Sequence, residues 1–326
     1  MKLSREDLLG IYLTMQRIRK FEKQTQKGFA KGKLPGFVHL SIGQEAIPAG
    51  VSFNLKKDDY ITSTHRGHGH LIAKGANMKL MMAENYGKET GYCKGKGGSM
   101  HIADTEIGIL GTNGIVGGGL NLACGAAFSI KQKGEDKVCV CYFGDGASGE
   151  GAFHEALNIA SIHKLPVVFI CENNLYAISC RQTDGMNIEN IADRAAGYGI
   201  PGEVVDGNDV LAVQEASANA IKNAKNGNGP TLLECKTYRW RGHFEGEPEN
   251  YRDKEEIKAW KEKDPIKRIE RYLLEKKITT EEELKKIQES AKEEAEEAAK
   301  FAEDSPWPDV KTVVKDVYTD IVEEAR

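Results

Sequence analysis

Two polar residues about thirty positions apart, Asp145 and Asn174, have the side chains that a hard metal ion requires. Asp145 offers a carboxylate oxygen, Asn174 offers an amide oxygen, and the backbone carbonyl of Tyr176 can add a third. Mg²⁺ prefers such an oxygen-only set when phosphate oxygens share its coordination shell. Gly144 and Gly146 flank the aspartate, and glycine lets the backbone approach a diphosphate closely. The residue types therefore predict a site for magnesium and a diphosphate.

These residues follow two apolar runs that have the pattern of buried parallel strands. The runs, residues 138–143 and 166–171, show no alternation of apolar and polar side chains. Between them, residues 150–163 carry apolar side chains at roughly helical spacing. The segment predicts a strand–helix–strand unit, in which the carboxyl ends of both strands lie at one edge of the sheet. Asp145 and Asn174 should meet at that edge.

The same turn also matches the glycine pattern of dinucleotide-binding folds, G-x-G-x-x-G, at residues 144–149. Asp145 argues against this alternative, because a carboxylate beside a pyrophosphate is unfavourable unless a cation bridges the two. Glu172, the nearest acid after the second run, lies 27 positions beyond Asp145, farther than the usual ~20. An ordinary strand–helix turn with a solvated aspartate stays open when this stretch is taken alone.

A second polar segment, residues 59–70, contains His65, Arg66, His68 and His70. Zinc binding is disfavoured here because the histidine spacing is irregular, no cysteine joins the group and Arg66 would repel the ion. A glycine-rich loop with a planar, permanently charged donor suits an anion better. The segment therefore predicts phosphate or active-site contact, with a solvated basic loop as the alternative.

Two further histidines lie in short segments whose sequence is consistent with either a structural or a catalytic role. His39 lies in GFVHL, and a lone histidine of this kind is more often structural than catalytic. His243 follows a run of cations in residues 238–244, whose simplest interpretation is an exposed basic turn. Residues 94–101, basic and rich in glycine, are equally consistent with a flexible surface loop.

Several specific motifs run through almost the whole chain, from about Leu8 to about Val317. They are GFVHL (36–40), ITSTHRGHGH (61–70), GKGGSMH (95–101), GTNGIVGGG (111–119), GDG followed by NN (144–174) and TYRWRGHFEG (237–246). With these motifs the chain resembles the alpha subunit of the thiamine-diphosphate-dependent decarboxylating component of 2-oxo acid and acetoin dehydrogenase complexes.

The resemblance implies a role for each matching residue. The metal ligands would be Asp145, Asn174 and the backbone carbonyl of Tyr176. The residues in contact with thiamine diphosphate would be His65, Arg66, Gly114, Val116, Gly144, Asp145, Gly146, Ala147, Asn174 and His243. Proton transfer near the reacting carbon would fall to His68 and His243. The implied cofactors are thiamine diphosphate, which carries out most of the chemistry, and Mg²⁺.

The expected substrate is inferred in part from the loop after His243. Phe244 stands where the mammalian pyruvate enzymes have a phosphorylatable serine, so control by that phosphorylation is not expected. Residues 245–248 and 63–70 look more like the bacterial acetoin-cleaving branch. The expected function is the alpha subunit of an acetoin dehydrogenase. The alternatives are a pyruvate or branched-chain 2-oxo acid dehydrogenase alpha subunit and, outside enzymes, a non-catalytic regulatory subunit of the same fold.

The length of the chain implies half an enzyme. Thiamine enzymes need a second domain whose glutamate activates the cofactor, and 326 residues leave room for the diphosphate-binding half and its extensions only. The resemblance therefore implies a beta subunit in an α₂β₂ heterotetramer, with the cofactor between the subunits. It also implies a lipoyl-bearing acyltransferase that receives the two-carbon product.

Composition excludes several other classes of protein. A net charge of −4 with mixed signs gives no basic face for nucleic acid. The seven cysteines form no C-x-x-C pair, and Cys139 and Cys141 suit a strand core better than a redox pair. No segment has the features of a signal peptide or an apolar run of about 18 residues, so a cytoplasmic protein without membrane contact is expected.

The remaining segments continue an alternation of strands and helices. Residues 188–198 and 210–224 predict helices, and residues 203–205 and 231–236 predict strands. This order predicts an α/β fold, a doubly wound and mostly parallel sheet with helices on both faces. We expect an N-terminal helical extension (1–35), a diphosphate-binding α/β domain (36–253) and a C-terminal helical region (254–326).

Overall fold

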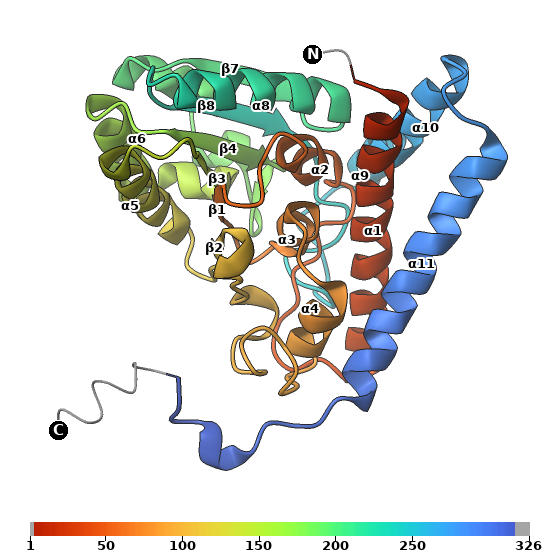
Figure 1. Cartoon of the computed structure of the whole chain (residues 1–326). Helices are drawn as coiled ribbons and strands as arrows, with labels where there is room; N and C mark the ends of the chain where they lie inside the picture. The colour runs from red at the N-terminus through yellow and green to blue at the C-terminus, as the bar shows by residue number, and fades with distance from the viewer. Residues whose placement is uncertain (1–2, 317–326) are drawn as a thin grey trace.

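A six-stranded sheet forms the centre of the computed structural model, which describes residues 3–316 (Figure 1). The strand order is β2-β1-β3-β4-β8-β7, and every neighbouring pair is parallel. The strands are β1 (Tyr60–Thr62), β2 (Ile109–Gly111), β3 (Cys139–Gly144), β4 (Val167–Asn173), β7 (Gly202–Asp206) and β8 (Thr231–Lys236). A short antiparallel pair, β5 (Tyr176–Ala177) and β6 (Cys180–Arg181), stands apart from this sheet.

Successive side chains of the central strands enter different hydrophobic clusters on the two faces of the sheet. In β3, Val140 and Tyr142 join one cluster, and Cys139, Cys141 and Phe143 join the other. The first cluster is covered by α1 (Arg5–Ala30), α2 (Ala46–Ser52), α3 (His68–Lys74), α4 (Met78–Asn85) and α8 (Val210–Lys225). The second is covered by α5 (Gly118–Lys133) and α6 (Gly151–Ile162). The predicted doubly wound fold is confirmed.

The predicted elements are present with one change of type, and several short elements were not predicted. In the predicted helix 188–198 only η4 (Ile191–Tyr198) is helical, and it is a 3₁₀ helix; before it, the Gln182 side-chain amide donates to the carbonyl of Glu189 at 3.0 Å. Strands β1 and β2 were not predicted, since each has three residues and is too short to show a pattern. All seven cysteines are free thiols.

The C-terminal helices pack on the N-terminal helix. These are α9 (Lys254–Lys261), α10 (Pro265–Glu275) and α11 (Glu281–Asp304), and α11 lies along α1 (Figure 1). Ala291, Ala295, Ala298 and Ala302 form the buried stripe of α11, and small side chains at this spacing allow close helix packing. Arg19 in α1 forms buried ion pairs with Glu45 and with Asp264.

The two helical extensions are therefore joined to each other and to the sheet domain. The boundaries at residues 35 and 253 stay a prediction, and the end of the predicted C-terminal region, residues 317–326, lies outside the described residues. Short turns such as η5 (Val310–Thr312) follow α11. Among residues 3–316, no helix has the length and apolar character needed to span a membrane.

Candidate active site

Four neighbouring strands, β1, β3, β4 and β8, end at the same edge of the sheet. The residues that follow them are 63–66, 145–149, 174–176 and 237–239, in the same order. Ligands of open α/β folds bind at this edge, because the loops there diverge and leave a crevice. The sheet order thus brings together segments that lie up to about 170 residues apart in the chain.

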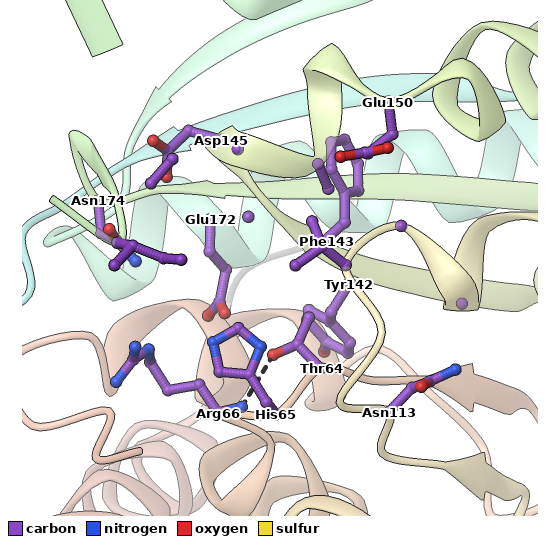
Figure 2. A pocket seen from close by; sticks show the side chains of 18 of the residues that line it. Thr64, His65, Arg66, Asn113, Tyr142, Phe143, Asp145, Glu150, Glu172 and Asn174 are labelled. Carbon is purple, nitrogen blue, oxygen red and sulfur yellow. Dashed lines mark hydrogen bonds between the residues drawn. The ribbon is translucent and has the colours of Figure 1, made fainter. Parts of the chain in front are cut away.

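A cavity of about 250 Å³ lies between these loops (Figure 2). The predicted site residues that line it are His65, Arg66, Val116, Gly144, Asp145, Gly146, Ala147, Asn174, Tyr176 and His243. Gly114 and His68 do not line it. Further lining residues, which sequence reasoning missed as site residues, include Ser63, Thr64, Asn113, Tyr142, Glu150 and Glu172.

The carboxylate of Asp145 and the amide of Asn174 form the end of the cavity nearest β3 and β4. Asp145 is buried, and burial raises its pKa to about 6, although the backbone amide of Asn174 donates a hydrogen bond that lowers it. The side-chain nitrogen of Asn174, Nδ2, donates to Gln44 Oε1 at 3.3 Å. Within the described chain, Asn174 Oδ1 is buried without a partner. A buried carboxylate beside an unpartnered amide oxygen fits a bound cation.

The turn after β3 and the start of β5 approach each other closely around this pair. A Cβ atom on Gly146 would lie 2.8 Å from the Cβ of Ala177, so any larger residue would push the two segments apart. The carbonyl of Tyr176 accepts a hydrogen bond from Arg239 Nη1 at 3.3 Å. The Tyr176 hydroxyl donates to Glu256 Oε2 in α9 at 2.8 Å, which fixes the segment from its other side.

Two buried arginines, Arg66 and Arg239, supply positive charge to the cavity. Arg66 donates to the carbonyls of Leu40 at 2.7 Å and His243 at 3.0 Å, and Arg239 donates to the carbonyl of Ile178 at 2.8 Å. Burial, followed by repulsion from Arg239, lowers the pKa of Arg66 to about 9. In residues 3–316 neither arginine forms an ion pair with a carboxylate. The cavity is therefore arranged for an anion.

Three imidazole rings, those of His39, His65 and His243, face one another beside the arginines. Their ring centroids are 4.7 to 5.4 Å apart in edge-to-face arrangements. Burial, followed by the charge of Arg66, lowers the three pKa values to about 3, 2 and 4, in residue order. All three rings are neutral at pH 7. The structural interpretation of His39 favoured from its sequence context did not anticipate this contact, because its partners lie far away in the chain.

Glu172 is a buried acid on the cavity wall that sequence reasoning did not assign to the site. Its Oε1 lies 3.1 Å from His70 Nε2, and His70 Nδ1 lies 2.8 Å from the Ser63 hydroxyl. The His70 ring stacks on Tyr142 at a centroid distance of 3.8 Å. An acid at the end of a fully buried strand is the signal that could have identified it, since Glu172 pairs in register with Gly144.

His68, predicted to transfer protons, lies in the interior and is fully buried. Its Nδ1 lies 3.1 Å from Glu22 Oε2, and its Nε2 is flanked by the Ser99 hydroxyl at 2.9 Å and the Asn85 amide at 3.3 Å. Burial alone would raise the pKa of Glu22, but His68 and the hydrogen bonds from Ser41 lower it. Because both ring nitrogens have partners and neither reaches the cavity, this geometry argues against the predicted role.

The cavity wall on the side of α5 is apolar and open. Val116 is 48 % exposed and the neighbouring Ile115 is 72 % exposed, although both line the cavity. Gly114 does not line the cavity, and a Cβ atom on it would lie 3.3 Å from the His101 ring. The loop thus places bulky, solvent-exposed side chains on the cavity wall.

Together, the parallel sheet and the cavity define an α/β protein with a buried carboxylate and two arginines in a cavity at the carboxyl edge of the strands. Residues 13–311 match the model of the family described as "Dehydrogenase E1 component". The chain belongs to this family, whose members are thiamine-diphosphate-dependent oxidoreductases.

Similar proteins cover nearly the whole chain. The chain is 51 % identical to the alpha subunit of acetoin:2,6-dichlorophenolindophenol oxidoreductase from Bacillus subtilis, over 98 % of this chain and 95 % of the relative. It is 46 % identical to the subunit of the same name from Cupriavidus necator, over 97 % and 95 %. It is 40 % identical to the alpha subunit of the pyruvate dehydrogenase E1 component from Porphyra purpurea, over 98 % and 94 %.

Proposed function

We propose that this chain is the alpha subunit of an acetoin-oxidising E1 enzyme and that its cavity binds the diphosphate half of thiamine diphosphate with Mg²⁺. One observation carries the site proposal. The buried Asp145 and the unpartnered Asn174 Oδ1 lie in the same cavity as two arginines that have no carboxylate partner among the described residues. The names of the relatives at 51 % and 46 % identity support acetoin as the substrate.

In this proposal the metal is held by Asp145, Asn174 Oδ1 and the carbonyl of Tyr176. These are hard oxygen donors, as Mg²⁺ prefers. The carbonyl of Tyr176 is already oriented by Arg239, and the hydroxyl of the same residue is fixed by Glu256. Gly144, Gly146 and Ala147 line the cavity beside Asp145, where the absence of large side chains leaves room for phosphate oxygens.

The positive side of the cavity would bind the diphosphate. Arg66 offers a permanent charge, and the neutral rings of His65 and His243 can donate hydrogen bonds without repelling each other. When bound, thiamine diphosphate supplies a nucleophilic carbon and the electron sink for carbon–carbon cleavage. His243, neutral and on the cavity wall, is the group that can accept or return a proton there. We assign His68 to positioning instead.

The exposed apolar loop before α5 would hold the end of the cofactor that lies away from the diphosphate. Val116, which lines the cavity, would offer the cofactor a bulky side chain, and Gly114, which does not line it, would offer backbone groups. A half-open cavity of this kind requires a second surface that completes it. The E1 alpha subunits among the relatives imply a beta subunit as that surface.

The surface beside the cavity supports such a partner. The helices α5 and α6 expose large apolar side chains on one side of the sheet, namely Leu122, Phe128, Ile159 and Ile162. Exposed apolar groups that gather on neighbouring helices are typical of protein interfaces. We propose an α₂β₂ heterotetramer with the cofactor between the subunits, a lipoyl-bearing acyltransferase as the acceptor of the product, and a cytoplasmic location.

A pyruvate-decarboxylating alpha subunit is the second candidate. The 40 % identity to the pyruvate dehydrogenase relative from Porphyra purpurea favours it. The same cavity would serve both substrates, because the metal, diphosphate and histidine contacts concern the cofactor rather than the substrate. The acetoin proposal uses residues 245–248, which follow Phe244, whose ring packs edge-to-face on Phe37 at 5.0 Å.

The test is turnover of the co-purified alpha and beta subunits with thiamine diphosphate, Mg²⁺ and 2,6-dichlorophenolindophenol as electron acceptor. Acetoin, pyruvate and a branched 2-oxo acid are compared in parallel. We expect reduction of the dye with acetoin, dependent on thiamine diphosphate. Preference for pyruvate would replace acetoin with the second candidate. Absence of cofactor-dependent turnover on all three would support a non-catalytic subunit.

A further inference from the structure

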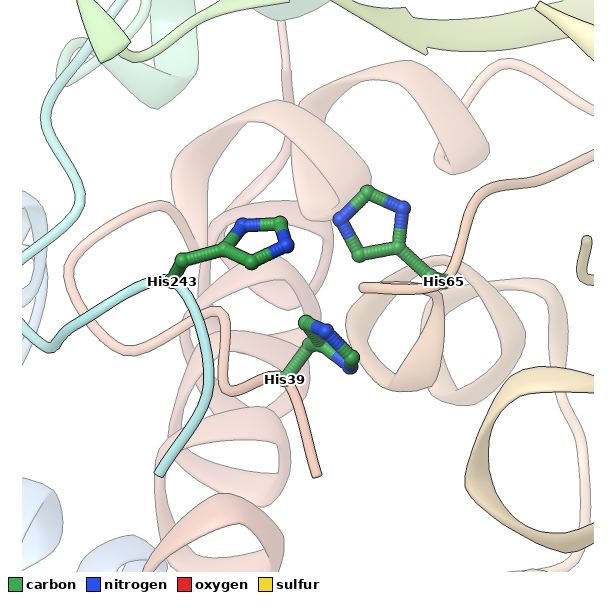
Figure 3. A group of neighbouring side chains, drawn as sticks. All are labelled: His39, His65 and His243. Carbon is green, nitrogen blue, oxygen red and sulfur yellow. The ribbon is translucent and has the colours of Figure 1, made fainter. Parts of the chain in front are cut away.

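Three histidines from separate segments face one another, as Figure 3 shows, and two of them, His65 and His243, line the cavity. His39 precedes α2, His65 follows β1 and His243 follows β8. One ligating nitrogen from each ring lies within 4.8 Å of the others. No spacing rule connects the three positions, and the histidines that do stand close together in the chain, His65, His68 and His70, are separated in space by their different partners.

The cluster contains unused ligand atoms. Over residues 3–316, the Nδ1 atoms of His39 and His243 are buried and have no hydrogen-bond partner. His39 is 6 % exposed, so its nitrogen has no access to bulk water. Imidazole in its neutral form has a lone pair that can bind a metal. By contrast, both nitrogens of His68 and of His70 have partners.

We propose that His39, His65 and His243 form a binding site for a divalent transition metal of the zinc type. Tetrahedral Zn²⁺ holds imidazole nitrogens at about 2.0–2.1 Å, which places them roughly 3.4 Å from one another. The three nitrogens therefore need to approach by at most about 1.4 Å from their present separation. His65 and His243 also line the cavity, so the cluster borders space that a further ligand of the metal can occupy.

The ion is selected by ligand type. Imidazole suits zinc, copper and nickel, whereas Mg²⁺ prefers oxygen, so Mg²⁺ belongs with Asp145 and not with the histidines. Arg66 and Arg239 lie near the cluster and repel cations, which weakens the site for every ion and leaves only strong imidazole binders. The site is therefore not a second magnesium site.

Zinc and thiamine diphosphate exclude each other in this proposal, a point that rests on the proposed function. His65 and His243 would contact the diphosphate, and a metal on their ring nitrogens takes those atoms away. The metal also places a third cation beside Arg66 and Arg239, where the cofactor requires space for its phosphate oxygens. Zinc is thus an inhibitor that acts on the cofactor-free chain.

The experiment measures binding of Zn²⁺ alone to the full-length, cofactor-free chain by equilibrium dialysis and metal analysis. We expect one Zn²⁺ per chain that His39→Gln weakens roughly tenfold or more. His163→Gln is the matched control, because His163 is an exposed histidine at the end of α6 outside the cluster. X-ray absorption should show three imidazole nitrogens at about 2.0–2.1 Å. His65→Gln provides a second variant if His39→Gln unfolds, as judged by circular dichroism.

Unchanged zinc binding in folded His39→Gln and His65→Gln would overturn the site and identify the bound zinc as adventitious. Competition is measured separately on the alpha–beta pair, where thiamine diphosphate with Mg²⁺ should raise the apparent Kd for zinc at least tenfold. Simultaneous binding of both would overturn the exclusion. Failure of the zinc-free pair to bind thiamine diphosphate would instead refute the proposed function, and the zinc measurement on the chain alone is independent of it.

Discussion

Three histidines within six residues, His65, His68 and His70, end in two kinds of environment, and the contrast between them separates chemistry from architecture. His65 lies on the cavity wall among other neutral rings. His68 lies in the interior against the carboxylate of Glu22, and His70 lies against Glu172. The first residue belongs to a loop, and the other two belong to α3, whose geometry turns their side chains to different neighbours.

The difference between the two regions is the state of their polar atoms. Around His68 and Glu22 nearly every donor has an acceptor, as a buried polar network requires for stability. In the cavity, Asn174 Oδ1 and His243 Nδ1 have no partner within the described part of the chain. A protein retains such atoms at a cost in stability, and a ligand removes that cost. Substitutions in the first region should affect stability, and those in the second should affect binding.

The largest effect is expected from Glu22→Ala, which leaves His68 and the Ser41 amide without their acceptor. Each buried donor left without an acceptor costs about 1–3 kcal/mol of unfolding free energy. Urea denaturation of the wild type, Glu22→Ala and Glu22→Gln measures the loss, and the glutamine variant should lose less because it keeps an acceptor oxygen. A stability of Glu22→Ala equal to that of the wild type would remove the distinction between the two regions.

Asp145→Asn should show the opposite behaviour. We expect at least about a hundredfold loss of Mg²⁺-dependent affinity for thiamine diphosphate, because a metal ligand loses its charge. The cofactor-free chain should be no less stable than the wild type, since the substitution removes a buried carboxylate. Calorimetric titration of the alpha–beta pair and thermal unfolding measure the two quantities. Asp184→Asn, at an exposed aspartate, is the control, and an equal loss of affinity there would contradict the assignment.

The smallest effect is a dependence on pH that sharpens the same contrast. Burial raises the pKa of Asp145 to about 6, so in the cofactor-free chain its protonated form is favoured up to that pH. Protons then compete with the metal, and affinity for Mg²⁺ with the cofactor should fall by about tenfold per pH unit below 6. For the same reason, the cofactor-free wild type should lose stability relative to Asp145→Asn as pH rises from about 4 through 6. A flat affinity profile from pH 5 to 7 would contradict the burial of this carboxylate.

The central part of the fold could be predicted because local patterns determined it. The apolar runs that became β3 and β4 are buried throughout, and glycine and polar residues mark their ends. The meeting of Asp145 with Asn174 followed from the topology of a single strand–helix–strand unit. Family motifs led to Arg66 and His243, which composition and spacing alone left open as parts of basic loops.

The rest of the site depends on contacts between distant segments. His39 and His243 meet because the backbone amide of Glu245 donates to the carbonyl of Val38 at 2.8 Å, and no local pattern encodes that bond. The role predicted for His68 depends on what surrounds its side chain in the folded chain. Glu22 in α1 binds the ring and holds it in the interior. Sequence proximity thus identified the segment, while packing determined which of its histidines reaches the cavity.

The contact between Glu256 and the Tyr176 hydroxyl has a consequence for the order of events during synthesis. The two residues are 80 positions apart, and the acid that fixes the predicted metal-binding segment lies in α9. At about 5–20 residues per second, a ribosome needs roughly 4–16 s to pass from one to the other. At the start of that interval strands β1 to β4 and Asp145 have been synthesised, whereas Glu256, which binds the Tyr176 hydroxyl, is made only at its end. Capture of the cofactor should therefore be a late step in the maturation of the chain, after the emergence of its C-terminal helices.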